Sequence, residues 1–313
     1  MSSNADNDTD FASHSLVGNN FGYLGRPLAR DFSNADLVVM GIPYDMGTSG
    51  RAGARHGPQG VRAASANLRW EDRRWPWRFN ALERVRVVDA GDVAFTPGES
   101  QTMVDAVTAM AARVFSAGKT LLSFGGDHFV ALPLIRAAAA SHGPLALIHF
   151  DAHTDTEPTT PSRYYHGSMF HHAPREGLVE PANSVQIGIR TAYDYEDHPY
   201  QVLDAAWVND HSAEEVVAAI RQRVGDRPAY ISFDIDCLDP AFAPGTGTPV
   251  AGGLSSDRAL KILRGLQGLT LVGMDVVEVA PAYDHAELTS LAAATLGLEF
   301  IYLIASQSPD NAQ

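Results

Sequence analysis

Short hydrophobic runs recur along the chain, and each is bounded by Gly, Pro or Asp. Runs of this length that are rich in β-branched and aliphatic residues are typical of buried β-strands. They predict about eight strands, at Leu37–Ile42, Val85–Ala90, Thr120–Phe124, Leu145–Phe150, Val185–Ile189, Ala206–Val208, Ala229–Phe233 and Leu269–Val277.

Segments with helical spacing lie between these runs. Thr102–Ala117 and Ser212–Val224 carry apolar side chains every three or four positions, and Ser212 with Glu215 forms a capping box. Because apolar strands alternate with amphipathic helices, the sequence predicts a three-layer α/β fold. Its sheet would be mostly parallel, with helices on both faces.

The chain shows no internal repeat and no Pro/Ser-rich linker. We therefore expect residues 21–313 to form a single catalytic domain, preceded by a flexible polar tail over residues 1–20. Two segments, Leu68–Asn80 and Glu157–Tyr165, are predicted to be excursions from the regular layers.

Acidic residues outnumber basic ones, 37 to 23, which gives a formal net charge of −14. This charge repels polyanions, so it argues against binding to nucleic acid or to an anionic membrane, and it suits a cationic small molecule. The N-terminus lacks a secretory signal pattern. Leu288–Ala305 is interrupted by Thr, Ser, Gly and Glu, so we expect it to fall short of a bilayer span and the protein to be cytoplasmic.

The single cysteine, Cys237, excludes an intramolecular disulfide and a thiolate metal cluster. It is interpreted as an inert buried thiol. Any metal ion must therefore be held by carboxylates and imidazoles.

Polar clusters follow four of the apolar runs. Their members are Gly125-Gly126-Asp127-His128, Asp151-Ala152-His153-Thr154-Asp155, Asp234-Ile235-Asp236 and Glu278. In an open α/β sheet, ligands bind at the carboxyl ends of the strands. We therefore expect the four clusters to converge at one edge of the sheet.

The spacing within the clusters suggests metal binding. Residues two apart on an extended strand point to the same side, which would align Asp151, His153 and Asp155. A lone Asp-x-Asp or Asp-x-His is usually a turn or helix cap, but so many acids at one edge require a cation. Oxygen ligands with some imidazole and no sulfur favour two Mn²⁺ ions over a structural zinc, and such a pair activates water for hydrolysis.

Two further residues, His166 and Glu278, can each be interpreted in two ways. His166 is either a surface or structural histidine or, if it lines the cleft, a proton carrier. Glu278 is either a salt-bridge or capping residue or a fork for a planar cation.

Three longer stretches resemble the signatures of the ureohydrolases, the arginase and agmatinase family. They are Ser123–Phe129, His149–Thr156 and Ser232–Pro240. The resemblance continues through Asp45–Arg51, Ala243–Pro249 and Met274–Pro281, and residues from about 20 to 304 are most similar to the bacterial agmatinase branch.

This resemblance implies an arginase-like fold and a binuclear manganese enzyme, a homotrimer or homohexamer, that hydrolyses agmatine to putrescine and urea through metal-activated hydroxide. Asp151 and Asp234 would bridge the two Mn²⁺ ions of each subunit. The ligands of one ion would be His128, Asp151, Asp155 and Asp234, and those of the other Asp151, His153, Asp234 and Asp236.

The resemblance also implies catalytic roles. Glu278 would bind the guanidinium group, Asp155 would orient the nucleophile, and His166 would move a proton to the leaving amine. Glu157 stands where arginases carry an asparagine that binds the amino acid's carboxylate, so a carboxylate here would disfavour arginine or 4-guanidinobutyrate and tolerate a free amine. Its alternative is a solvent-exposed loop acid.

Other hypotheses remain. A hydrolase of 4-guanidinobutyrate or another ω-guanidino compound would use the same site. A single-zinc deacetylase would need fewer ligands than the six present, and a non-enzymatic metal-stabilised protein would not need His166 and Glu278. The Trp- and Arg-rich segment 69–78 is interpreted as a packed loop or subunit contact, since its acids and the overall charge disfavour nucleic-acid stacking.

Overall fold

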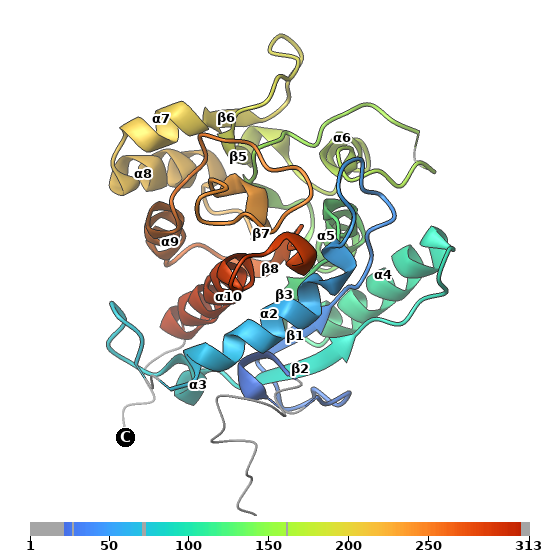
Figure 1. Ribbon diagram of the computed structural model, residues 1–313, viewed down its shortest axis with the longest axis vertical. Helices are drawn as coiled ribbons and strands as arrows, with labels where there is room; N and C mark the ends of the chain where they lie inside the picture. The colour runs from blue at the N-terminus through green and yellow to red at the C-terminus, as the bar shows by residue number, and fades with distance from the viewer. Residues whose placement is uncertain (1–21, 27, 71–72, 161, 308–313) are drawn as a thin grey trace, which may run out of the picture.

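The computed structural model describes residues 22–26, 28–70, 73–160 and 162–307, so the predicted tail over residues 1–20 lies outside the described part. One eight-stranded sheet runs through the molecule in the order β2-β1-β3-β8-β7-β4-β5-β6 (Figure 1). Every neighbouring pair is parallel. The strands are β1 Leu37–Gly41, β2 Val87–Asp92, β3 Thr120–Phe124, β4 Ala146–Phe150, β5 Val185–Ile189, β6 Gln201–Asp204, β7 Ala229–Asp234 and β8 Leu271–Val277.

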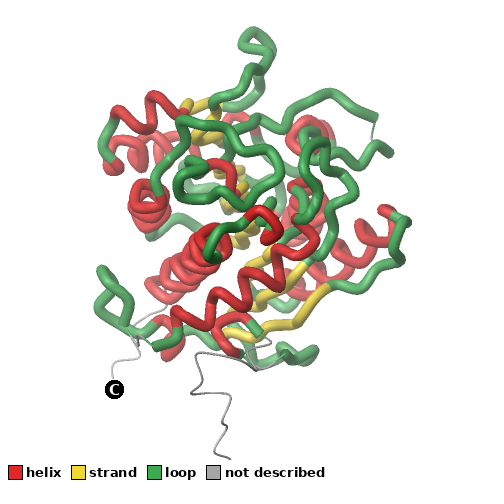
Figure 2. The backbone as a smooth tube through the Cα atoms, viewed as in Figure 1, coloured by secondary structure: helices red, strands yellow, loops and turns green. Residues whose placement is uncertain are grey.

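Helices cover both faces of this sheet, and long loops join them to the strands (Figure 2). The helices are α2 Gly57–Ser65, α3 Ala81–Arg84, α4 Ser100–Ser116, α5 Ala131–His142, α6 Met169–Arg175, α7 Ala205–Asp210, α8 Ala213–Val224, α9 Ser256–Gly265 and α10 Leu288–Gln307. One hydrophobic core packs under α2, α8, α9 and α10, and a second packs under α4, α5 and α6. The predicted three-layer α/β fold is confirmed.

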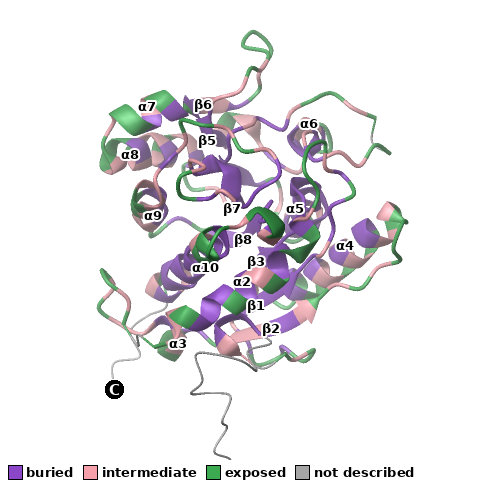
Figure 3. Cartoon of the chain, viewed as in Figure 1, coloured by how far each residue is buried: buried purple, intermediate pink, exposed green. Residues whose placement is uncertain are grey.

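The alternation of side chains along each strand produces these two cores. In β1, Leu37 and Val39 belong to the first core, whereas Val38 and Met40 belong to the second. Because helices cover both faces, the strand is buried along its whole length, as its continuous apolar sequence predicts (Figure 3).

The two predicted helices are present with nearly the predicted bounds. At the start of α8, the Ser212 side chain accepts a hydrogen bond from the Glu215 N–H at 3.2 Å, and the Glu215 carboxylate accepts one from the Ser212 N–H at 2.8 Å. These two bonds satisfy N–H groups that the first helical turn leaves unpaired.

The predicted strand Ala206–Val208 is wrong. These residues lie in α7, and the strand that joins the sheet edge is β6, immediately before it. The Asp204 side chain accepts a hydrogen bond from the Trp207 N–H at 2.8 Å and thereby caps the helix. Ala205 and Val208 are three residues apart and both buried, which is helical spacing.

The sequence predicted that the segment of helix α10 falls short of a bilayer span. By length and composition alone, however, the helix could cross a membrane, because its most apolar 18 residues have a mean hydropathy of 1.7. Of these 18 residues, 78% are buried inside the protein. The helix is apolar on all sides because it packs between α2, α9 and β8. It is therefore a core helix of this fold.

The Trp- and Arg-rich segment packs onto α10. The ring of Trp77 stacks on Tyr302 at 5.3 Å, and its Nε1–H donates to the Glu299 carboxylate at 2.6 Å. Glu299 is fully buried and also accepts hydrogen bonds from Arg264. Trp77 therefore belongs to a packed loop, whereas Trp70 and Trp75 are about three-quarters exposed.

Candidate metal centre and cleft

The four strands that precede the polar clusters, β3, β8, β7 and β4, are consecutive neighbours in the sheet. All four run in the same direction, so the residues after their carboxyl ends meet at one edge. The structure thus brings together, as predicted, His128, Asp151, His153, Asp155, Asp234, Asp236 and Glu278.

The reason why these side chains converge differs from the predicted one. Asp151, His153 and Asp155 lie beyond the end of β4, and Asp236 lies in the short 3₁₀ helix Ile235–Cys237. Asp155 has a φ of 51°, which lies in the left-handed region that non-glycine residues rarely adopt. Backbone turns, not strand alternation, therefore aim the carboxylates, and the strain at Asp155 is typical of a functional site.

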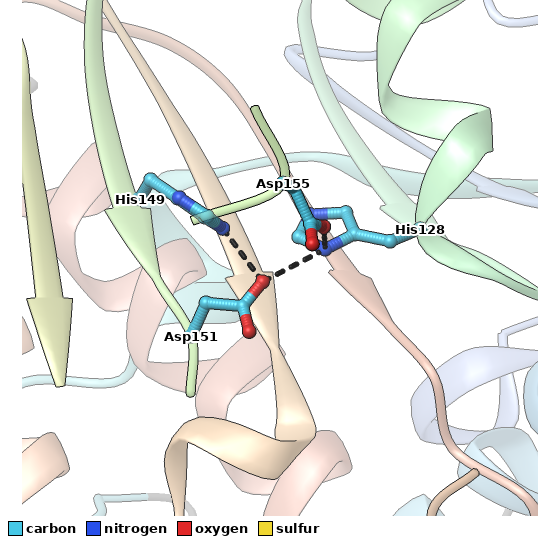
Figure 4. Close-up of side chains that lie close together, drawn as sticks. All are labelled: His128, His149, Asp151 and Asp155. Carbon is cyan, nitrogen blue, oxygen red and sulfur yellow. Dashed lines mark hydrogen bonds and ion pairs between the residues drawn. The ribbon is translucent and has the colours of Figure 1, made fainter. Parts of the chain in front are cut away.

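Three carboxylates surround one nitrogen of His128. Its Nδ1 lies 3.1 Å from Asp151 Oδ2 and 2.9 Å from Asp155 Oδ2 (Figure 4). It also lies 3.2 Å from Asp234 Oδ2. All four side chains are at least nine-tenths buried. The arrangement concentrates negative charge where solvent cannot screen it.

The contacts of the other ring nitrogen, Nε2, determine which nitrogen of His128 carries the proton. His128 Nε2 lies 2.9 Å from the Ser232 hydroxyl, which donates its own proton to Asp275 at 2.8 Å. The Ser232 oxygen must therefore accept a proton from Nε2, which leaves Nδ1 of the neutral ring as a lone pair facing three carboxylates. Nδ1 is buried and has no hydrogen-bond partner among the described residues.

A cation resolves this repulsion. Burial alone would lower the pKa of His128, but the contacts with Asp151, Asp155 and Asp234 outweigh it and raise the pKa well above its usual value. The protein thus attracts positive charge to Nδ1, and a divalent ion supplies it while using the imidazole lone pair and the carboxylate oxygens as ligands.

A second group of potential ligands adjoins the first. His153 Nδ1 lies 3.3 Å from Asp151 Oδ1 and 3.2 Å from Asp236 Oδ2. Asp151 therefore contributes one oxygen to each group, an arrangement that would allow its carboxylate to bridge two ions. Burial and the charge of Asp151 raise the pKa of Asp236 to about 6, because two neighbouring buried carboxylates disfavour each other's charge. A divalent cation between them would relieve this repulsion.

Backbone N–H groups fix the orientation of three of these carboxylates. Oδ1 of Asp151 accepts from His153 N at 2.6 Å, and Oδ1 of Asp236 accepts from Ala152 N at 3.1 Å. Oδ1 of Asp234 accepts from Asp236 N at 2.8 Å. Each Oδ2 is thereby directed into the cluster, so the site is held in place before any ion binds.

Glu278 and His166 lie beside the cluster and contact each other. His166 Nδ1 lies 2.8 Å from Glu278 Oε1. The same oxygen accepts a hydrogen bond from the backbone N–H of His128 at 2.8 Å. The Ser49 N–H donates to His166 Nε2 at 3.0 Å, so Nδ1 of the neutral ring carries the proton that Glu278 accepts. Burial lowers the pKa of His166, but Glu278 outweighs burial and raises it to about 9.

The second oxygen of Glu278, Oε2, is buried and has no hydrogen-bond partner in the described part of the chain. A Cβ atom added at Gly247 would lie 3.5 Å from Oε2 and 2.9 Å from the Arg51 carbonyl oxygen. The absence of a side chain at Gly247 therefore keeps space free near this oxygen. Glu278 has a φ of 63°, a second strained backbone position at the site.

A cleft of about 740 Å³ opens above these residues. His153, Asp155, His166 and Asp234 are among the residues that line it. Acidic and aromatic side chains form part of its wall, namely Glu157, Asp194, Asp197, Tyr165 and Tyr193. Glu157 is exposed and lines the cleft, so its role in substrate choice stays a prediction beside the alternative of a loop acid.

Sequence reasoning missed His149 and Ser49. His149 is fully buried in β4, and its Nε2 lies 2.8 Å from Asp151 Oδ2. An imidazole inside an otherwise apolar buried strand was the available signal. Ser49 lies in the quoted Asp45–Arg51 stretch, but its contact with His166 joins residues 117 positions apart, which no local pattern reveals.

Comparison with known proteins agrees with this geometry. The arginase family model matches residues 35–302. An agmatinase from Serratia proteamaculans (strain 568) is 61% identical over 298 residues, which cover 94% of this chain and 96% of the relative.

Two solved structures superpose closely. A hypothetical agmatinase from Burkholderia thailandensis has a TM-score of 0.90 at 46% identity, covering 93% of this chain and 92% of that one. The proclavaminate amidino hydrolase from Streptomyces clavuligerus has a TM-score of 0.89 at 40% identity, covering 93% of this chain and 99% of that one. Together with the buried His/Asp cluster, these matches show that the chain belongs to the arginase family.

Proposed function

We propose that the protein is an agmatinase, a binuclear metal hydrolase that cleaves agmatine to putrescine and urea. The observation that carries this proposal is the hydrogen bond from the backbone N–H of His128 to Glu278 Oε1. It holds a carboxylate whose other oxygen has no hydrogen-bond partner among the described residues, beside a cluster of acids that a cation would stabilise. Guanidinium binding and water activation are thus available at one place.

The ligand groups fit two Mn²⁺ ions. His128, Asp151, Asp155 and Asp234 would hold one ion, and Asp151, His153, Asp234 and Asp236 the other. Oxygen and imidazole donors without thiolate suit manganese. When bound, such a pair supplies a water of lowered pKa and positive charge at the reacting carbon.

The chain's own residues then perform the remaining tasks. Glu278 Oε2 accepts hydrogen bonds from the planar guanidinium and holds its carbon in line with the nucleophile. Asp155 orients the attacking water by accepting a hydrogen bond from it. His166 supplies the proton for the departing amine from its charged form, which the contact with Glu278 stabilises, and its ring lines the cleft.

The wall of the cleft supports a cationic substrate. The cleft is lined by three exposed acids, Glu157, Asp194 and Asp197. Arg175 also lines it and offsets part of their negative charge. Their summed field favours agmatine, which carries an amine at its far end, over a carboxylated substrate. An ω-guanidino acid such as 4-guanidinobutyrate is the alternative, because a relative of 40% identity is named for a different amidino compound.

Urea release from agmatine, 4-guanidinobutyrate and arginine by the manganese-loaded protein tests the substrate. We expect kcat/KM for agmatine to exceed that for each carboxylated compound by at least about tenfold. A preference for 4-guanidinobutyrate would overturn the substrate and retain the hydrolytic chemistry. No urea from any of the three would overturn the proposed reaction.

We also propose a cytoplasmic homotrimer or homohexamer, which rests on the family resemblance. Light scattering coupled to size-exclusion chromatography measures the assembly directly. A monomer at micromolar concentration would contradict it.

A further inference from the structure

A chain of hydrogen bonds runs from the wall of the cleft to the bridging carboxylate through two fully buried residues. His149 on β4 and Gln186 on β5 are register partners across the two strands, and both are 0% exposed. Gln186 Nε2 lies 2.9 Å from His149 Nδ1, and His149 Nε2 lies 2.8 Å from Asp151 Oδ2. His198, which lines the cleft, completes the chain with its Nε2 2.7 Å from Gln186 Oε1.

The direction of each bond follows from one carbonyl group. The Thr154 carbonyl oxygen can only accept, and it lies 2.7 Å from Gln186 Nε2, so this atom is the amide nitrogen. Its second proton points to His149 Nδ1, which must accept. The proton of the neutral His149 ring is therefore on Nε2, and it is donated to Asp151 Oδ2.

His149 is thus oriented as a donor. A metal ligand must present a lone pair, but the His149 nitrogen nearest to the cluster carries a proton in this bonding pattern. The ring is further fixed by Phe170, whose centroid lies 4.3 Å away. Although His149 lies among His128, Asp151 and Asp155 (Figure 4), its hydrogen bonds give it a different task from theirs.

We propose that His149 is a positioning residue that holds the bridging carboxylate of Asp151 for the two metal ions, with Gln186 and His198 fixing its tautomer. The inference rests on the proposed metal-dependent function. Hydrogen bonds to the groups that bind a metal directly typically change metal affinity by about 10- to 100-fold when removed. Asp151 takes part in both ligand groups, so the loss affects both ions.

The test measures manganese binding by calorimetry and metal content by mass spectrometry, on the full chain. In His149→Leu, which cannot donate, we expect manganese affinity to fall by about 10- to 100-fold. Two ions per chain should still bind at saturation. In His149→Gln, whose side-chain amide can donate from nearly the same place, affinity should recover to within a few-fold of the original protein.

Two additional variants keep the test decisive. Gln186→Leu removes the group that fixes the His149 tautomer while leaving the imidazole, so we expect a smaller loss of affinity. His172→Leu is the matched control, because His172 is a buried histidine whose Nε2 contacts Thr159 Oγ1. Its manganese affinity should be unchanged.

The outcomes separate this inference from the proposed function. Unchanged affinity in both His149→Leu and Gln186→Leu overturns the positioning role. Saturation at one ion in His149→Leu also overturns it, because His149 would then be a ligand. If the original protein itself binds no manganese, the proposed function fails before the inference is reached.

Discussion

The metal cluster and the wall of the cleft differ in how deeply their acidic side chains are buried. In the cluster, Asp151, Asp234 and Asp236 are buried, and each is bound by a backbone N–H. In the wall, Glu157, Asp194 and Asp197 are exposed and lie on loops. The cluster is preorganised for one kind of chemistry, whereas the wall interacts with substrates through water-screened charges.

Because of this difference, we expect the cluster to determine the chemical reaction and the wall to determine the preference among substrates. A buried charge acts strongly because little solvent screens it, whereas an exposed charge contributes little. Changes in the cluster should therefore abolish hydrolysis of every substrate. Changes in the wall should alter the preference among substrates and leave the chemistry in place.

The largest effect is expected for Asp234→Asn. The substitution removes a buried negative charge that contacts His128 Nδ1, and we expect kcat/KM for agmatine to fall by on the order of a thousandfold or more. Metal content should fall below two ions per chain. Asp210→Asn, at an exposed acid at the end of α7, is the control, and a similar loss there would contradict the assignment.

Glu278→Gln should separate substrate binding from metal binding. The neutral amide keeps the shape of the side chain but cannot balance a guanidinium charge, so kcat/KM should fall by roughly a hundredfold or more. Metal content should stay at two ions. Loss of an ion in this variant would show that Glu278 belongs to the cluster instead.

His166→Asn should change the pH dependence as well as the rate. We expect kcat to fall by about a hundredfold, as for loss of a general acid. The pKa of His166 is raised to about 9, so its protonated form persists above neutral pH and is lost as the pH rises through that value. Two bound cations lower this pKa, so the descending limb of kcat should lie at or below about pH 9.

The variant should lack that limb. A kcat profile with the same descending limb in His166→Asn would exclude His166 as the proton donor. Metal content serves as the control, because His166 is not among the proposed ligands.

The smallest effect is expected for Glu157→Gln. The side chain is exposed, so KM for agmatine should rise only a few-fold, and the ratio of agmatine to 4-guanidinobutyrate turnover should fall. Glu196→Gln is the matched control, an exposed acid of the loop that carries Asp194 and Asp197. An unchanged substrate ratio in Glu157→Gln would leave it as a loop acid without a role in specificity.

The sequence predicted the fold well where hydrophobic patterns extend over several residues. β3 and β5 have the predicted bounds, and β4 and β8 begin one or two residues later than predicted. The pattern fails at Ala206–Val208, where three apolar residues fit both a strand and a helix. The cap at Asp204 decides between them, and it acts over only three residues.

The candidate site was predictable as a set of residues but not as a geometry. Motif spacing identified Asp155, yet its left-handed backbone could not be read from residue types. The hydrogen-bond partners of His166 and His149 come from distant parts of the chain, Ser49 and Gln186. Such partners depend on how the strands are ordered in the sheet, which the sequence alone did not give.

The most direct test of the account is a manganese titration of the metal-stripped protein in which bound metal and urea release from agmatine are measured together. We predict no activity without metal, and activity that rises as two ions bind per chain. Full activity with one ion, or with none, would contradict a binuclear centre built from His128, Asp151 and Asp234.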